Sequence, residues 1–241
     1  MITLRAGRLF FGVAYTQARA SDPPQVRAAK SKITTAARRK VNLRHAWQKL
    51  MLLLGANFDT TDLVVSLTYN DDHLPASRKE ANAQLAKYLV LLRRAFRREG
   101  RELRYVYCTE HKHGDGRWHH HLVIPAASYE TVRSLWAFGS DIDIDTIDLW
   151  GYEELAKYLT KEAREEGAPV GARSWSSSRN LERPVRESQL VEDYVTLAPP
   201  PGASVLGRDS KVNEWGSFEY LSCLLPAEPV KTRRVRPPRR R

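Results

Sequence analysis

The stretch RWHHHLVI, residues 117–124, reads as a β-strand, because it ends in apolar and β-branched residues and follows a Gly-Asp-Gly turn at residues 114–116. Side chains of a strand alternate between its two faces, so we expect His119 and His121 on one face and His120 on the other. Two imidazoles on one face, separated by one residue, can share a divalent metal ion. The stretch therefore predicts a strand that carries part of a metal site.

A third metal ligand is available in the segment before this turn. Residues 103–110 also alternate, and they are expected to pair with the histidine strand as a hairpin. Cys108 and Glu110 share a face of that segment, so Glu110 can reach the side that carries His119 and His121. Two imidazoles and a carboxylate leave coordination positions open for a substrate, which suits catalysis better than a closed structural site. These ligands fit several metals, including zinc, and a polar outer strand face is the alternative explanation.

Residues 151–163 have the composition and apolar spacing of an amphipathic helix. Tyr158 and Lys161 lie three residues apart, so they are neighbours on the surface of that helix. A phenol is a weak nucleophile near its usual pKa of about 10, and a nearby cation is expected to favour the phenolate. The pair is a candidate nucleophile, with a tyrosine that only packs as the alternative. Tyr152 falls on the apolar stripe and is expected in the core.

A third segment, residues 63–69, is apolar and β-branched, which is typical of a central strand in a sheet. The loop that follows, residues 70–75, is rich in turn-forming residues. The sequence therefore predicts a central strand that ends in a turn.

In order and spacing, these segments resemble the three motifs of HUH endonucleases, the replication initiator (Rep) proteins that begin rolling-circle replication. Residues 66–75, with SLTY followed by HLP, resemble the first motif in the style of microvirus, phage and plasmid initiators. His119 and His121 resemble the second motif, histidine–hydrophobic–histidine, although a further histidine stands at the middle position. Tyr158 and Lys161 resemble the third motif, tyrosine-x-x-lysine.

The resemblance covers roughly residues 60–182 and implies roles for single residues. Glu110 matches the acidic residue that such initiators place just upstream of the histidine pair. This match implies that Glu110, His119 and His121 hold Mg²⁺ or Mn²⁺. Glu154 stands where many microvirus initiators carry a further tyrosine, which implies a single-tyrosine enzyme.

The expected order of strands and helices favours an α+β fold with an antiparallel sheet. The resemblance implies more: a ferredoxin- or RRM-like palm, flanked by helices, that nicks and joins single-stranded DNA at a specific site with the help of a metal. Tyr158 would form a 5′-phosphotyrosine link and free a 3′-hydroxyl, while Lys161 would help to offset transition-state charge. The implied partners are a single-stranded DNA origin, a host polymerase and a host helicase. No phosphate-binding loop of the GxxxxGK[ST] type occurs in the chain.

Aromatic and arginine side chains near the motifs are candidate DNA contacts, because rings and guanidinium groups stack on unpaired bases. They are Trp118, Arg173, Trp175 and Arg179. Packing against the core is the alternative for both tryptophans.

The chain of 241 residues has 39 Lys and Arg against 28 Asp and Glu, a formal net charge of +11. This surplus raises non-specific affinity for phosphate backbones, although net charge says nothing about the fold. Its two cysteines give no disulfide framework, and no apolar run is long enough to span a membrane. We therefore expect a cytoplasmic protein of a bacterial host cell, with no membrane partner.

Composition predicts three parts: a basic helical extension over residues 1–58, the HUH endonuclease domain over residues 59–225, and a basic, Pro- and Arg-rich disordered tail over residues 226–241. In the first part, residues 1–22 are expected to hold one strand and a loop, and residues 24–55 a long basic helix. Ser77 and Glu80 have capping-box spacing and predict a helix over residues 78–98. Asp141, Asp143 and Asp145 alternate along an expected strand, where a solvated face is favoured over a second metal site.

Two other classes of function remain open at this point. An HUH transposase or a mobilisation relaxase shares the chemistry but performs a different biological reaction. A non-catalytic, basic DNA-binding protein would carry a degenerate site. Only the enzymes would form a covalent adduct with DNA, so adduct formation separates these classes.

Overall fold

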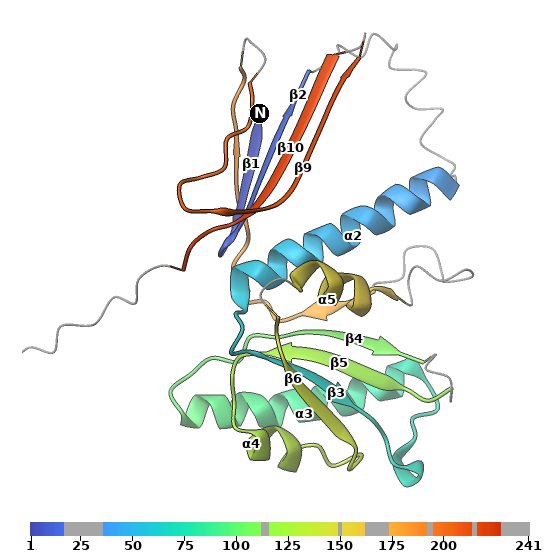
Figure 1. Ribbon diagram of the computed structural model, residues 1–241. Coiled ribbons are helices and arrows are strands. Elements are labelled where there is room, and N and C mark those ends of the chain that lie inside the picture. Colours follow the sequence, from blue (N-terminus) through green and yellow to red (C-terminus); the bar gives the residue numbers. More distant parts are fainter. Residues whose placement is uncertain are drawn as a thin grey trace, which may run out of the picture. The chain divides into compact units, whose positions relative to one another are not determined.

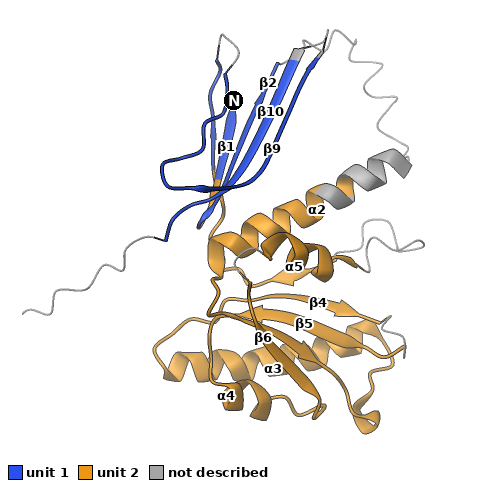
Figure 2. Ribbon diagram, in the orientation of Figure 1, with its two compact units in different colours: residues 1–4, 8–18, 186–241 blue, residues 5–7, 19–185 orange. Residues whose placement is uncertain are grey.

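The computed structural model describes residues 1–16, 36–111, 116–148, 151–161, 174–191, 195–213 and 216–227. The chain divides into two compact units (Figure 2). We call residues 5–7 and 19–185 the central unit, and residues 1–4, 8–18 and 186–241 the terminal unit. Each unit is built mainly on one five-stranded sheet.

The sheet of the central unit has the strand order β6-β3-β5-β4-β7, and its pairings are antiparallel. Its strands are β3 (Leu63–Leu67), β4 (Val106–Glu110), β5 (His119–Ile124), β6 (Ile142–Thr146) and β7 (Ser176–Ser177). The predicted hairpin is present as β4 and β5. The apolar strand β3 is central as predicted, because it pairs with both β5 and β6.

Helices cover both faces of this sheet, with α3 and α4 on one side and α2 and α5 on the other (Figure 1). Their bounds are α2 (Ala36–Asn57), α3 (Arg78–Arg98), α4 (Tyr129–Ser134) and α5 (Tyr152–Leu159), with a 3-10 turn, η2, at Asp71–His73. Apolar side chains of the sheet pack with α3 and α4 in one core, among them Val65, Leu67, Leu122 and Ile124. The opposite face of the sheet carries the polar residues of the predicted site.

The predicted helix over residues 78–98 is confirmed as α3. The Ser77 hydroxyl accepts a hydrogen bond from the Glu80 N–H at 3.2 Å, and the Glu80 carboxylate accepts one from the Ala76 N–H at 2.9 Å. These bonds satisfy backbone donors that a helix start leaves without helical partners. The predicted apolar stripe of α3 is buried, and it comprises Leu85, Tyr88, Leu89, Leu92 and Phe96.

The sheet of the terminal unit has the order β8-β1-β2-β10-β9. Its strands are β1 (Ile2–Ala6), β2 (Leu9–Tyr15), β8 (Val185–Ser188), β9 (Ser204–Asn213) and β10 (Gly216–Leu224). β10 pairs with β2 from Phe218 opposite Tyr15 to Leu224 opposite Leu9. Strands from the first and last parts of the described chain therefore form one sheet.

The expected divisions after residues 58 and 225 do not coincide with these units. The first sixteen residues hold two strands rather than one, and they pair with a strand that was expected inside the endonuclease domain. Local sequence patterns show that a segment is a strand but not which distant segment pairs with it. Much of the expected basic helix, residues 24–35, and most of the expected tail, residues 228–241, lie outside the described residues.

The predicted α+β class with an antiparallel sheet is confirmed, and the central unit is compatible with a palm-like fold. In the parts of the chain that the structure describes, no helix combines the length and the apolar character needed to cross a membrane.

Candidate active site

The register of β4 and β5 brings the predicted metal ligands to one face of the sheet. Glu110 pairs with His119, and Cys108 pairs with His121. Directly paired residues of an antiparallel ladder point to the same face, and residues one apart point to opposite faces. His120 therefore faces the other way. The placement that alternation predicted for Glu110 and the three histidines is confirmed.

His121 is buried, and three polar side chains lie around its ring. Ser66 Oγ, on the neighbouring strand β3, is 3.0 Å from His121 Nδ1. The Tyr158 hydroxyl is 3.2 Å from Nε2, and Glu110 Oε2 is 3.4 Å from the same nitrogen. If Nδ1 carries the proton and donates it to Ser66, Nε2 keeps its lone pair on the side of Glu110 and Tyr158. β3 thus helps to orient the imidazole.

The two tyrosines of α5 lie in different surroundings. Tyr152 is buried, and its hydroxyl donates a hydrogen bond to the Phe58 carbonyl oxygen at 2.7 Å. Tyr158 is 38% exposed, and its ring centroid is 4.8 Å from that of His121. Six helical residues at about 100° each separate the two side chains around the helix. The expected core position of Tyr152 is confirmed, and Tyr158 is the α5 tyrosine beside the predicted ligands.

Lys161, two residues after α5, contacts both Tyr158 and Glu110. Its Nζ is 4.2 Å from the centroid of the Tyr158 ring and 3.1 Å from Glu110 Oε2. Burial, followed by the charge of Glu110, raises the pKa of Tyr158 to about 12. The expectation that Lys161 favours the phenolate is therefore wrong for this arrangement. The physical reason is that the ammonium is paired with a carboxylate whose own charge disfavours a second anion nearby.

Glu110 is an ionised group in a buried position, with 2% of its surface exposed. Burial would raise the pKa of Glu110, but hydrogen bonds and charges from His121 and then Lys161 outweigh burial and hold this pKa below its usual value. Such a carboxylate needs a cation beside it, because an isolated buried charge is strongly disfavoured. In this structure Lys161 is a cation in that position.

The donor atoms of the site fit a divalent metal in kind and in face, since two imidazoles and a carboxylate share one side of the sheet. Over the described ranges, however, no group of three or more His, Cys, Asp or Glu side chains is arranged to hold a metal ion. A metal at Glu110 would have to share the carboxylate with Lys161 or displace it. The chemistry of the ligands therefore supports a metal site, while their present arrangement is that of an ion pair.

His120 is fully buried on the opposite face, within a chain of hydrogen bonds. Tyr69 Oη is 2.6 Å from its Nε2, and Thr109 Oγ1 is 2.9 Å from its Nδ1. The Thr109 hydroxyl donates to Asn82 Oδ1 at 2.7 Å, so it accepts from Nδ1–H, and Nε2 accepts from Tyr69. Burial, then the charges of the two neighbouring histidines, lowers the pKa of His120 to about 3. His120 is thus a neutral core residue that ties β5 to β4 and α3.

The four candidate DNA contacts differ in their surroundings. Trp118 is partly buried against the core, and its ring centroid is 4.3 Å from that of His111, which agrees with the packing alternative. Trp175 is half-buried and directly precedes β7, whereas Arg179 is exposed. Arg173 lies outside the described residues.

Two residues near Tyr158 were not singled out for this site by the sequence. Ser66 lies opposite His121 in the β3–β5 register, and Asp143 lies opposite Ser66 in the β3–β6 register. Both therefore share the face of the site. The charge of Asp143 adds, after burial and nearer groups, to the raised pKa of Tyr158. Only the strand order reveals these neighbours, because the three strands are far apart in the sequence.

Comparison with known proteins adds one match. Residues 62–164 match the family model of the replication-associated protein ORF2. The matched segment runs from the start of β3 to just beyond Lys161, so it contains the whole cluster around Tyr158. Neither the curated proteins nor the solved structures gave a match. The similarity to this replication-associated family supports a Rep-like protein with a role in the initiation of replication.

Proposed function

We propose that this protein is an HUH-type initiator of rolling-circle replication, which nicks and joins single-stranded DNA at an origin. The observation that carries the proposal is the convergence of Tyr158, His121 and Glu110. The Tyr158 hydroxyl is 3.2 Å from His121 Nε2, and this nitrogen is 3.4 Å from the Glu110 carboxylate. A hydroxyl nucleophile beside an imidazole and a buried carboxylate is suited to phosphoryl transfer. The family similarity supports the replicative setting.

In the proposed reaction the Tyr158 oxygen attacks a phosphodiester of the DNA. A bond forms between this oxygen and phosphorus, and the bond from phosphorus to the 3′ oxygen breaks. The phenolic proton is lost, and the departing 3′ oxygen takes up a proton to become a 3′-hydroxyl. One phosphodiester is exchanged for another, so attack of a 3′-hydroxyl on the phosphotyrosine reverses the reaction and joins the strand. The free 3′-hydroxyl would prime a host polymerase, with a host helicase opening the duplex.

The charges around Tyr158 set the requirements of this step. A pKa of about 12 means that the phenol is protonated at neutral pH, so its proton must leave as the bond to phosphorus forms. Lys161, 4.2 Å from the ring centroid, can bind the phosphate and offset its growing negative charge. Mg²⁺ or Mn²⁺ held by Glu110, His119 and His121 would polarise a phosphoryl oxygen and neutralise the carboxylate that raises the pKa of Tyr158.

The test is covalent capture of DNA that carries the label at its 3′ end, because the downstream fragment stays on the protein. The substrate is single-stranded DNA from the region that flanks the gene, incubated with Mn²⁺ and analysed on a denaturing gel. Wild type should form the adduct, Tyr158→Phe should not, and Tyr152→Phe is the matched control that should. Peptide mapping that places the nucleotide on any residue other than Tyr158 would contradict the nucleophile assignment.

The ligand assignment is tested with the two neighbouring histidines. His121→Ala should abolish the adduct and leave most single-stranded DNA binding, because basic residues dominate that binding. His120→Ala, compared for equal amounts of folded protein, should retain much more activity, because its side chain points to the other face. Equal losses in the two variants would refute the metal site.

A further inference from the structure

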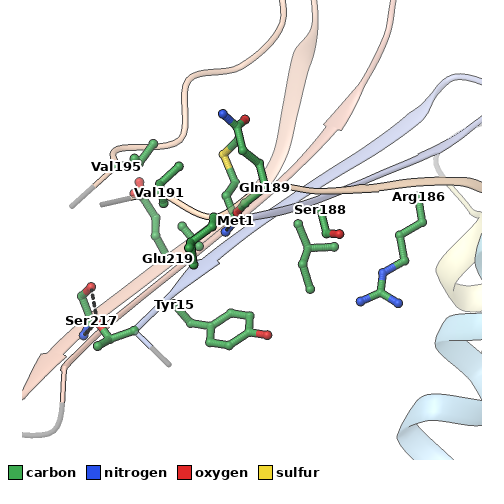
Figure 3. Close-up of a pocket in the computed structure, with 13 residues that line it drawn as sticks. Met1, Tyr15, Arg186, Ser188, Gln189, Val191, Val195, Ser217 and Glu219 are labelled. Carbon is green, nitrogen blue, oxygen red and sulfur yellow. Dashed lines mark hydrogen bonds between the residues drawn. The ribbon is translucent and has the colours of Figure 1, made fainter. Parts of the chain in front are cut away.

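A pocket of about 530 Å³ opens on the terminal unit, at the end of its sheet where β2 stops (Figure 3). Ligand pockets in proteins measure about 300–1,000 Å³, so this one can hold a nucleotide-sized group. Tyr15 and Arg186 line it, together with polar side chains that include Thr16, Ser188 and Ser217. Tyr15 is 48% exposed, an unusual position for a large aromatic side chain that had only a packing role.

Tyr15 has an aromatic neighbour across the sheet. Phe218 on β10 pairs directly with Tyr15, so the two rings lie on one face, and Phe218 is 37% exposed. Lys211 on β9 pairs with Phe218 and continues the row on that face. Lys211 Nζ is 4.0 Å from Asp209, but an exposed pair of this kind is weak and leaves the ammonium able to bind a phosphate. Two aromatic rings are therefore flanked by Arg186 at the pocket and Lys211 at the edge strand.

The carboxylate in the pocket wall does not oppose an anionic ligand with its full charge. Glu219 is buried, its Oε2 accepts a hydrogen bond from the Leu197 N–H at 2.9 Å, and its Oε1 is 3.6 Å from Arg208 Nη2. Glu219 pairs with Ala14, so it belongs to the opposite face of the sheet from Tyr15. Figure 3 shows the Glu219 and Tyr15 side chains on different sides of the strands.

Exposed rings beside cations are the chemistry with which proteins bind single-stranded nucleic acids, because rings stack on bases of any sequence and cations bind the backbone. The sequence adds charge to the same unit, since the sixteen residues that follow Leu225 include seven Lys and Arg. An apolar protein partner would not account for cations on both sides of the rings. The occupant that fits this row of side chains is a DNA strand.

We infer that Tyr15, Phe218, Arg186 and Lys211 form a second binding site for single-stranded DNA, separate from the residues around Tyr158. A base enters the pocket and stacks on Tyr15, and an adjacent base stacks on Phe218. Arg186 and Lys211 bind the phosphates on either side. This inference rests on the proposed function, which supplies single-stranded DNA as the ligand.

The affinity of the full chain for fluorescein-labelled oligothymidylate, measured by anisotropy in EDTA, tests the site without cleavage. Tyr15→Ala and Phe218→Ala should each weaken binding roughly 5- to 150-fold, the loss expected for one stacked base. Tyr15→Phe should bind like wild type, because the ring remains. Arg186→Ala and Lys211→Ala should weaken binding and lower the slope of log affinity against log salt by about 0.7 each.

Matched controls come from exposed residues elsewhere. Tyr129→Ala removes a tyrosine that is 51% exposed on α4 of the central unit, and Arg94→Ala removes an exposed cation of α3. Val212→Ala changes the neighbour of Lys211, whose side chain is 74% exposed and points to the other face. Each control should alter the affinity much less than the corresponding change in the row. Thermal unfolding of every variant shows whether the fold is kept.

A measurement on the unchanged protein guards against a variant that fails to fold. Oligonucleotides with iodouracil should cross-link to peptides that contain Tyr15 or Phe218, and cross-links confined to the central unit would overturn the inference. Wild-type affinity in Tyr15→Ala and Phe218→Ala would also overturn it, even if Tyr158 forms its adduct. Binding that depends on Tyr15 in a protein that forms no adduct would support this site and refute the proposed catalysis. A wild type that binds no single-stranded DNA would refute both.

Discussion

At the scale of single residues, Ser66 is the best placed to control His121. Its hydroxyl is 3.0 Å from His121 Nδ1, on a directly paired position of the neighbouring strand. A hydrogen bond at the far nitrogen fixes the orientation and tautomer of a metal-binding imidazole, and its loss costs about 10–100-fold in metal affinity or activity. Ser66→Ala should therefore shift the Mn²⁺ dependence of adduct formation to higher concentration by this factor.

The control for this prediction is Ser66→Thr, which keeps the hydroxyl and suits a strand. It should restore most of the Mn²⁺ affinity. DNA binding in EDTA should be unchanged in both variants, because no metal is involved in that measurement. If Ser66→Ala lowered the rate by the same factor at every Mn²⁺ concentration, the hydroxyl would not act through metal affinity.

His120 makes the free energy of unfolding depend on pH. Its pKa is lowered from 6.5 to about 3 in the folded protein, mainly by burial. Between these values the unfolded chain binds a proton that the folded protein does not, so stability falls as the pH decreases. The contribution is fully present above pH 6.5 and is lost progressively towards pH 3. Urea unfolding at several pH values measures this loss.

His120→Gln is the matched variant, because an amide offers a donor and an acceptor but does not titrate in this range. Its free energy of unfolding should fall less steeply than that of wild type below pH 6.5. Carboxylates titrate in both proteins, so the difference between the two curves reports the histidine. Parallel curves would show that His120 does not bear this pH dependence.

At the scale of elements, α5 combines an anchor with a reactive group. Tyr152 fixes the start of the helix through its bond to the Phe58 carbonyl oxygen, and Tyr158 faces the site near its end. Tyr152→Phe leaves a buried carbonyl without this donor, so it should lower the free energy of unfolding by about 1–3 kcal/mol while the adduct still forms. Tyr158→Phe should show the reverse pattern, with no adduct and a smaller loss of stability.

Urea unfolding and adduct formation on the same two variants check this exchange of effects. The two tyrosines carry the same chemical change on the same helix, so differences in helix propensity cancel. A larger loss of stability in Tyr158→Phe than in Tyr152→Phe would contradict the assignment of anchor and nucleophile.

Across the molecule as a whole, the net charge of +11 separates DNA binding from catalysis. Single-stranded DNA should still bind in EDTA, and its affinity should fall steeply with salt, with a slope of about −0.7 per phosphate neutralised. Adduct formation should stop in EDTA and return when Mn²⁺ is added. Anisotropy at several salt concentrations, with and without EDTA at constant ionic strength, checks both statements. Loss of binding on removal of metal alone would mean that the metal holds the DNA.

The local geometry of the central unit was predictable from neighbouring residues. Strand alternation predicted the facing of Glu110 and the histidines, and the spacing of Tyr158 and Lys161 predicted their contact. The cap of α3 at Ser77 was equally visible. These features follow from the periods of strand and helix, about 2 and 3.6 residues, which are properties of the backbone and can be read along a short stretch of chain.

The meeting of distant segments could be seen only in the folded chain. Folding paired β2 with β10, set Ser66 beside His121, and placed Lys161 against Glu110. The last contact reversed the expected effect on Tyr158, because a pKa depends on burial and on every charge within reach rather than on the nearest residue in sequence. Strand pairing and electrostatics both act through distance in space, and that distance is fixed only when the chain has folded.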